Sequence, residues 1–137
     1  MIINKLNKTI LVTGASLGLL AVVLGAFGAH GLEKLVDAKN INSFNTGVQY
    51  QMYHSVIFLI LGNMTMIPNT SKKQIFYFFL LGILFFSGSI YILVMDAIFG
   101  ISLTSLAFLT PVGGFLLILG WIWLLAAFIK NKTSKVS

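Results

Sequence analysis

Four long apolar segments constrain this chain more than any other feature of its sequence. A membrane-spanning helix needs about 20 consecutive, mostly apolar residues. Four stretches meet that requirement, and they cover residues 10–29, 48–67, 75–95 and 105–129. Apolar and polar residues do not alternate along them, as they would in a membrane β-strand. The pattern therefore predicts an all-α fold, an integral membrane four-helix bundle that forms a single domain over residues 1–137.

The composition agrees with a membrane environment and excludes several kinds of chemistry. Hydrophobic residues make up 58% of the chain and charged residues only 9%, against about 25% charged in an average soluble domain. The chain has no cysteine, which excludes disulfides, thiolate metal sites and cysteine nucleophiles. The net charge of +6 comes from lysines beside the apolar segments, a pattern typical of membrane proteins. We therefore predict membrane lipids, and no nucleic acid, as partners.

The lysines also predict an orientation for the four segments. Two precede the first segment, two lie between the second and the third, and three follow the fourth. Positively charged residues near membrane spans favour the cytoplasmic side. We therefore expect a multi-pass protein of the cytoplasmic membrane, with both termini cytoplasmic and the connection at residues 31–47 outside.

The connection at residues 31–47 predicts further local structure. Its sequence LEKLVDAK places Leu32, Leu35 and Val36 on one helical face, which predicts a short helix on the outer membrane surface between the first and second spans. The sequence TGVQ then favours the start of the next helix, with Thr46 as its N-cap and Gln49 closing a capping box.

Small residues predict close packing between helices. Five of them recur at alternating spacings of 4 and 3 residues along the first segment, and they are Gly14, Gly18, Ala21, Gly25 and Gly28. Such a stripe lets another backbone approach closely, either from a neighbouring helix or from a second copy of the chain. In the fourth segment Pro111 predicts a kink, and Gly113 and Gly114 would allow a close crossing.

Polar side chains gather at one predicted depth of the bundle. With a rise of about 1.5 Å per residue, eight of them fall in the outer half of the bilayer, namely His30, Tyr50, Gln51, His54, Ser87, Ser89, Tyr91 and Thr110. The inner half holds little beyond Thr13, Ser16 and Asn63. His30 fits the cluster less well, because a continuous helix would point its side chain away from the glycine stripe.

Two interpretations of this polar cluster stay open. It is either a hydrogen-bonded plug, in which His54 bonds to Ser87, Tyr91 or Thr110, or a pocket for a lipid or small amphipathic ligand. Both follow from the high cost of an unpartnered polar group in hydrocarbon.

Catalytic and metal chemistry fit the pattern poorly. A metal or haem held by His30 and His54 needs both side chains at one depth and facing each other. Asp96 is expected at the outer rim, on the opposite face from Ser87, which disfavours Ser-His-Asp catalysis. We predict no catalytic residue, no metal and no cofactor. Whether the protein is an enzyme stays open, and a non-enzymatic role is preferred.

Four sequence blocks resemble a known family. They are GAFGAHGL at residues 25–32, TGVQYQMYHS at 46–55, FFSGSIYIL at 85–93 and TPVGG at 110–114. In order and spacing they resemble domain-of-unknown-function family 423, small bacterial membrane proteins with a eukaryotic relative called transmembrane protein 256. The resemblance implies a four-helix protein of the bacterial inner membrane and places most of the polar cluster on family positions. It implies no defined activity, only a link to membrane integrity.

Together these features predict a structural or binding protein that contributes to membrane stability, with a polar cluster that is either a structural plug or a site for a lipid or small amphipathic ligand. The alternative is a small transporter or channel-like protein. The inner half of one chain offers only Thr13, Ser16 and Asn63 to extend a path, so an axis between copies in a homo-oligomer is one way to form it.

Overall fold

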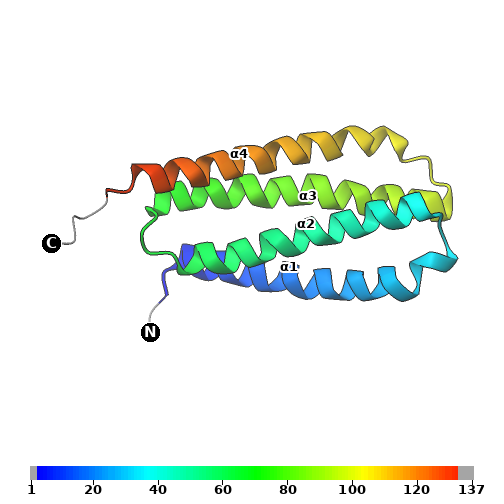
Figure 1. The fold of residues 1–137 in the computed structure, drawn as a ribbon, viewed down its shortest axis with the longest axis horizontal. Coiled ribbons are helices and arrows are strands. Elements are labelled where there is room, and N and C mark those ends of the chain that lie inside the picture. Colours follow the sequence, from blue (N-terminus) through cyan, green and yellow to red (C-terminus); the bar gives the residue numbers. More distant parts are fainter. Residues whose placement is uncertain (1–2, 133–137) are drawn as a thin grey trace.

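All regular structure in the part of the chain that the computed structural model describes, residues 3–132, is helical (Figure 1). The four long helices are α1 (Lys5–His30), α2 (Ala38–Asn63), α3 (Asn69–Phe99) and α4 (Leu109–Lys130). Successive helices run in opposite directions, so both ends of the described chain lie at the same end of the molecule. The prediction of an all-α fold with four helices is confirmed.

Within residues 3–132, three segments are long and apolar enough to cross a membrane. They are α1, α3 and the segment Thr104–Lys130, which includes α4. The helix α2 has 26 residues, but polar side chains fill its first half, so its composition does not mark it as a span. The crossing predicted for residues 48–67 therefore rests on the length of α2 and on its packing between apolar helices.

The start of α2 differs from the predicted capping box. The helix begins at Ala38, and Asp37 is its N-cap, with Oδ1 accepting a 2.9 Å hydrogen bond from the Asn40 amide. Thr46 lies inside the helix, where its hydroxyl donates to the Asn42 carbonyl. The prediction of a cap at Thr46 was wrong. The Asp37 carboxylate is a stronger N-cap acceptor nine residues earlier, and the polar residues between Asp37 and Thr46 can all be helical.

The predicted surface helix between α1 and α2 is a single 3₁₀ turn, η1 (Leu32–Lys34). Leu32 is fully buried in a small cluster with Phe44 of α2 and Val94 of α3. The turn thus anchors the connection to the protein, whereas the adjacent Leu35 is exposed.

Pro111 does not kink the fourth helix. Residues 104–108 form a 3₁₀ helix, η2 (Thr104–Phe108), and α4 begins at Leu109. Pro111 therefore lies in the first turn of α4, where backbone N–H groups have no intrahelical partner, so its missing N–H breaks no helical bond. The predicted kink was wrong because the α-helix starts later than the apolar segment.

Packing follows the order of the helices along the chain. Each helix packs on the next, with α3 between α2 and α4 (Figure 1). Within residues 3–132 the backbone of α4 approaches α3 but neither α1 nor α2. The bundle is thus open on one side of α3, because α2 and α4 lie on either side of that helix and their backbones do not meet.

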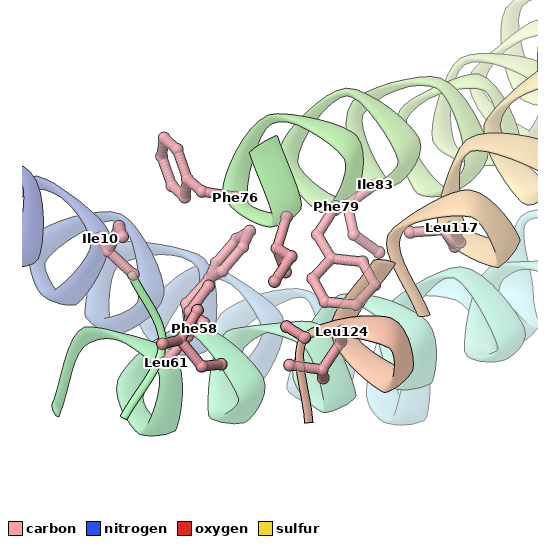
Figure 2. Packing of buried hydrophobic residues seen from close by; sticks show 11 residues of the cluster. Ile10, Phe58, Leu61, Phe76, Phe79, Ile83, Leu117 and Leu124 are labelled. Carbon is pink, nitrogen blue, oxygen red and sulfur yellow. The ribbon is translucent and has the colours of Figure 1, made fainter. Parts of the chain in front are cut away.

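The main apolar core lies toward the end of the molecule that carries the chain termini. Its central rings are Phe58 of α2 and Phe79 of α3, both fully buried, with Ile10 of α1 and Leu117 and Leu124 of α4 around them (Figure 2). The small cluster around Leu32 lies at the opposite end. Most of the buried polar side chains lie between these two apolar clusters.

Candidate functional site

The small residues of α1 face α2. A Cβ atom on Gly14 would lie 2.9 Å from Phe58 Cβ, and one on Gly18 would lie 2.6 Å from Ser55 Oγ. At Gly28 it would lie 2.9 Å from the Phe44 ring, but at Gly25 only 3.5 Å from Val48, an ordinary contact. Ala21 is buried on the same stripe. The close approach of α1 and α2 therefore uses this stripe within one chain.

The two glycines after Pro111 differ in their surroundings. A Cβ on Gly113 would meet the backbone of α3, at the Phe86 nitrogen and 2.8 Å from the Gly82 oxygen. A Cβ on Gly114 would lie 3.7 Å from the Phe86 ring. Of these two glycines, Gly113 is the one at which the backbones of α3 and α4 come close together.

Gln51 links three helices in the middle of the molecule. Its amide nitrogen donates a 2.9 Å hydrogen bond to the Leu17 carbonyl of α1. Its amide oxygen accepts a 2.7 Å hydrogen bond from the Tyr91 hydroxyl of α3. Because Gln51 is buried, both ends of its amide need these partners.

Three buried serines satisfy their hydroxyl groups across helices. Ser87 donates to the Gly47 carbonyl at 2.7 Å, and Ser55 donates to the Gly14 carbonyl at 2.7 Å. Ser89 Oγ lies 2.6 Å from the Thr110 hydroxyl of α4. These bonds join neighbouring helices in pairs, and in hydrocarbon such bonds hold helices together. Ser55 was not among the predicted cluster residues, although it lies one position after His54.

His54 uses both of its ring nitrogens. Nδ1 lies 2.8 Å from the Tyr50 carbonyl oxygen, and Nε2 accepts a 3.2 Å hydrogen bond from the Trp121 indole of α4. Because a carbonyl oxygen can only accept a hydrogen bond, Nδ1 carries the proton and Nε2 is unprotonated. The ring also packs edge-on against Phe79. The hypothesis that His54 bonds to Ser87, Tyr91 or Thr110 was wrong, because the Tyr50 carbonyl and the Trp121 indole already occupy its two ring nitrogens.

His30 lies away from this network. It is the exposed last residue of α1, whereas His54 lies 16 residues after the start of α2, or about 24 Å along the helix. A metal or haem held between the two histidines is therefore incompatible with the fold. Asp96, in the last turn of α3, has a buried Oδ1 without a hydrogen-bond partner among the described residues, and it makes no contact with the nitrogens of His54.

An open groove runs between α2 and α4 beside His54. It has a volume of about 480 Å³ and is lined by Tyr50, Tyr53, His54, Val56, Ile57 and Trp121. We call it the α2–α4 groove. Tyr50, Tyr53 and Trp121 are exposed in it, and the Tyr50 ring packs on Phe86 of α3, 4.7 Å away.

A second, more polar groove also lies between α2 and α4, over the other half of α3. It has a volume of about 450 Å³. Its polar lining consists of Asn40, Ser43, Thr46 and Thr110. The polar cluster predicted from sequence is thus divided into buried groups that bond within the protein and exposed groups that line the open side.

Lys72 is a buried polar residue that the sequence pattern had placed in a connection. Only 2% of its surface is exposed. Its ammonium group donates to Asn7 Oδ1 of α1 at 2.9 Å and to the Met64 carbonyl at 2.6 Å. Lys72 lies three and four residues before the buried Ile75 and Phe76, and this helical spacing was a signal that it shares their face.

The comparisons with known proteins identify relatives over nearly the whole chain. The family model described as "Protein of unknown function (DUF423)" matches residues 24–114. A UPF0382 membrane protein of Haemophilus influenzae is 35% identical over 127 residues, which cover 93% of this chain and 98% of that protein. The UPF0382 membrane protein YwdK of Bacillus subtilis is 39% identical, covering 90% of this chain and 98% of that protein.

A third relative has a name that states its location. The UPF0382 inner membrane protein YgdD of Escherichia coli is 34% identical over 134 residues, covering 96% of this chain and 97% of that protein. No solved structure matches the chain.

Proposed function

Because this chain belongs to the DUF423 family of UPF0382 membrane proteins, we propose that it is a binding protein of the inner membrane that holds a lipid or a small amphipathic ligand in its α2–α4 groove. The chain is a multi-pass inner membrane protein. In the proposed arrangement all four helices cross the bilayer and both termini are cytoplasmic.

The observation that carries the proposal is the open side of the bundle beside His54. Ligand sites are concave, mostly apolar and supplied with a few polar groups, and the α2–α4 groove has this character. Val56 and Ile57 supply apolar wall, whereas the hydroxyls of Tyr50 and Tyr53 supply polar groups. An amphipathic molecule matches both kinds of surface better than lipid tails alone.

The buried hydrogen bonds support the structural part of the proposal. Gln51 and Tyr91 join α1, α2 and α3, and Trp121 joins α4 to α2 through His54. These bonds hold the walls of the groove in fixed positions. A preformed site of this kind contributes to membrane stability by binding a membrane component rather than by chemistry.

The core argues against a transport path through one chain. The fully buried Phe58 and Phe79 lie between the polar network around Gln51 and the buried Lys72. A continuous polar path would have to cross this apolar layer. The transporter alternative therefore depends on an axis between several copies.

The distribution of charge supports the proposed orientation. Six described lysines lie at or near the end that carries the termini, and they are Lys5, Lys8, Lys72, Lys73, Lys130 and Lys132. The opposite end carries all three acidic residues of the chain with two lysines. This asymmetry favours a cytoplasmic location for the termini.

Native mass spectrometry of the protein extracted with its own lipids tests the binding role. A Val56→Trp variant fills the groove without touching the buried hydrogen bonds, and Leu19→Trp on α1 is the matched control at another exposed position. We expect one discrete bound mass that the wild type and the control carry and Val56→Trp lacks, whereas a mass that Val56→Trp keeps is bound outside the α2–α4 groove. The proposal would be overturned if the wild type carried no bound mass that Val56→Trp removes.

A further inference from the structure

A separate groove lies at the end of the molecule that carries the termini. It has a volume of about 550 Å³ and lies between the start of α1 and the start of α3. Lys5 and Lys73 line it, together with neutral polar residues such as Asn69 and with the apolar side chains of Leu6 and Phe76. The groove therefore combines two cations with hydrogen-bonding groups and an apolar wall.

Among the described residues, no carboxylate lines this groove. All of its lining residues are cationic or neutral, and the three acidic residues of the chain lie at the opposite end of the helices. Next to Lys73, the buried ammonium of Lys72 donates to two neutral oxygens, those of Asn7 and Met64. The electrostatic complement of this groove is thus an anion.

An apolar groove adjoins the charged one. It has a volume of about 370 Å³ and runs between α3 and α4, where Phe78, Leu81, Leu116 and Trp123 are among its lining residues. Lys73 and Tyr77 line both grooves. From Lys73 to Leu81 the surface of α3 extends by about 12 Å. A charged site thus continues into an apolar channel along the helix.

We propose that this double groove binds one anionic phospholipid, with its phosphate between Lys5 and Lys73 and an acyl chain along the groove between α3 and α4. Lysines near the membrane surface attract anionic headgroups, and an exposed tyrosine such as Tyr77 suits the boundary between headgroup and hydrocarbon. The site is distinct from the α2–α4 groove and shares no lining residue with it.

Lipid titration of delipidated protein, followed by native mass spectrometry, tests this site. Phosphatidylglycerol and phosphatidylcholine with identical acyl chains are compared. We expect the first phosphatidylglycerol molecule that binds to do so about tenfold more tightly than the first phosphatidylcholine molecule. The double variant Lys5→Gln with Lys73→Gln loses this preference. Lys8→Gln with Lys132→Gln removes the same charge outside the groove and keeps the preference.

Further variants and a headgroup analogue distinguish a bound lipid from general charge attraction and from a free phosphate compound. Leu81→Trp fills the apolar groove and weakens phosphatidylglycerol binding, whereas Val56→Trp in the α2–α4 groove leaves it unchanged. Equal losses in the two double lysine variants would mean general attraction by surface charge and would overturn the site. Binding of glycerol phosphate as tight as that of the lipid would also overturn it, in favour of a free phosphate compound.

Discussion

The ammonium group of Lys72 donates a 2.6 Å hydrogen bond to the carbonyl oxygen of Met64, the C-cap residue that follows α2. A second bond of 2.9 Å reaches Asn7 at the start of α1. One cation therefore joins the end of α2, the start of α3 and the start of α1. It also lies at a helix C-terminus, where the backbone carbonyls carry partial negative charge.

Replacing Lys72 by methionine should destabilise the protein. The change keeps an apolar chain of similar length but leaves the Asn7 amide oxygen and the Met64 carbonyl without their donor. We expect a loss of about 2 kcal/mol in the free energy of unfolding, measured by denaturation in detergent. Lys73→Met is the matched control, because the side chain of Lys73 is exposed and its replacement should change the free energy of unfolding little. Equal stability of the two variants would show that the Lys72 bonds contribute nothing.

Removing the hydroxyl of Tyr91 should loosen the contact between α2 and α3. In Tyr91→Phe the buried amide oxygen of Gln51 loses its only donor in the described structure. Hydrogen bonds between membrane helices contribute about 1 kcal/mol, and we expect a loss of that size in the same denaturation experiment. Tyr53→Phe, at an exposed position of α2, is the control. A loss of stability in Tyr53→Phe as large as that in Tyr91→Phe would contradict the role of the Tyr91–Gln51 hydrogen bond.

The four helices, and the gathering of most lysines at one end of the molecule, could be predicted from the sequence. Long apolar segments are compatible with few structures other than membrane helices, and the lysines lie beside them. The helix boundaries could not. Asp37 competes with Thr46 as a cap, and the stretch between them is too polar to be recognised as part of a buried helix. Pro111 predicts a kink only if an α-helical turn precedes it, and here residues 104–108 form a 3₁₀ helix and α4 begins at Leu109.

The partners of the polar residues were beyond the reach of sequence patterns. Spacing along one helix places His54 and Tyr50 on a shared face, but it does not show that Trp121 reaches His54 from another helix. Lys72 shows the same limit. Its charge favours a place outside the membrane segment, and only the ends of α1 and α2 create the two acceptors that allow it to be buried.

The two adjacent glycines of α4 should respond differently to alanine. A Cβ on Gly113 meets backbone atoms of Phe86 and Gly82, which cannot move aside as a side chain can. Gly113→Ala should therefore separate α3 from α4 and cost about 3 kcal/mol. Gly114→Ala meets only the Phe86 ring at 3.7 Å and should be tolerated. Melting temperatures of the two variants in one detergent check this, and an equal loss would place the close crossing elsewhere.

The stripe on α1 offers a similar comparison. Gly14→Ala brings a methyl group within 2.9 Å of Phe58 and 3.0 Å of the Ser55 carbonyl, so we expect a loss of about 2 kcal/mol. Gly25→Ala makes only a 3.5 Å contact with Val48 and should be neutral, or stabilising by up to about 1 kcal/mol, because alanine favours a helix. A stabilised Gly14→Ala variant would mean that α1 and α2 are farther apart than described.

The proposed orientation predicts which end of the molecule faces the cytoplasm. The chain has no cysteine, so a single introduced thiol reports one position without background. Glu33→Cys lies in η1, and Lys132→Cys lies just after α4; both side chains are exposed. In intact cells a membrane-impermeant maleimide should label Glu33→Cys, and it should label Lys132→Cys only after the membrane is broken. The reverse pattern would place the lysine-rich end outside, against the positive-inside rule. Labelling of both variants in intact cells would show an even number of crossings between residues 33 and 132, in which case α2, α3 and α4 do not all span the bilayer.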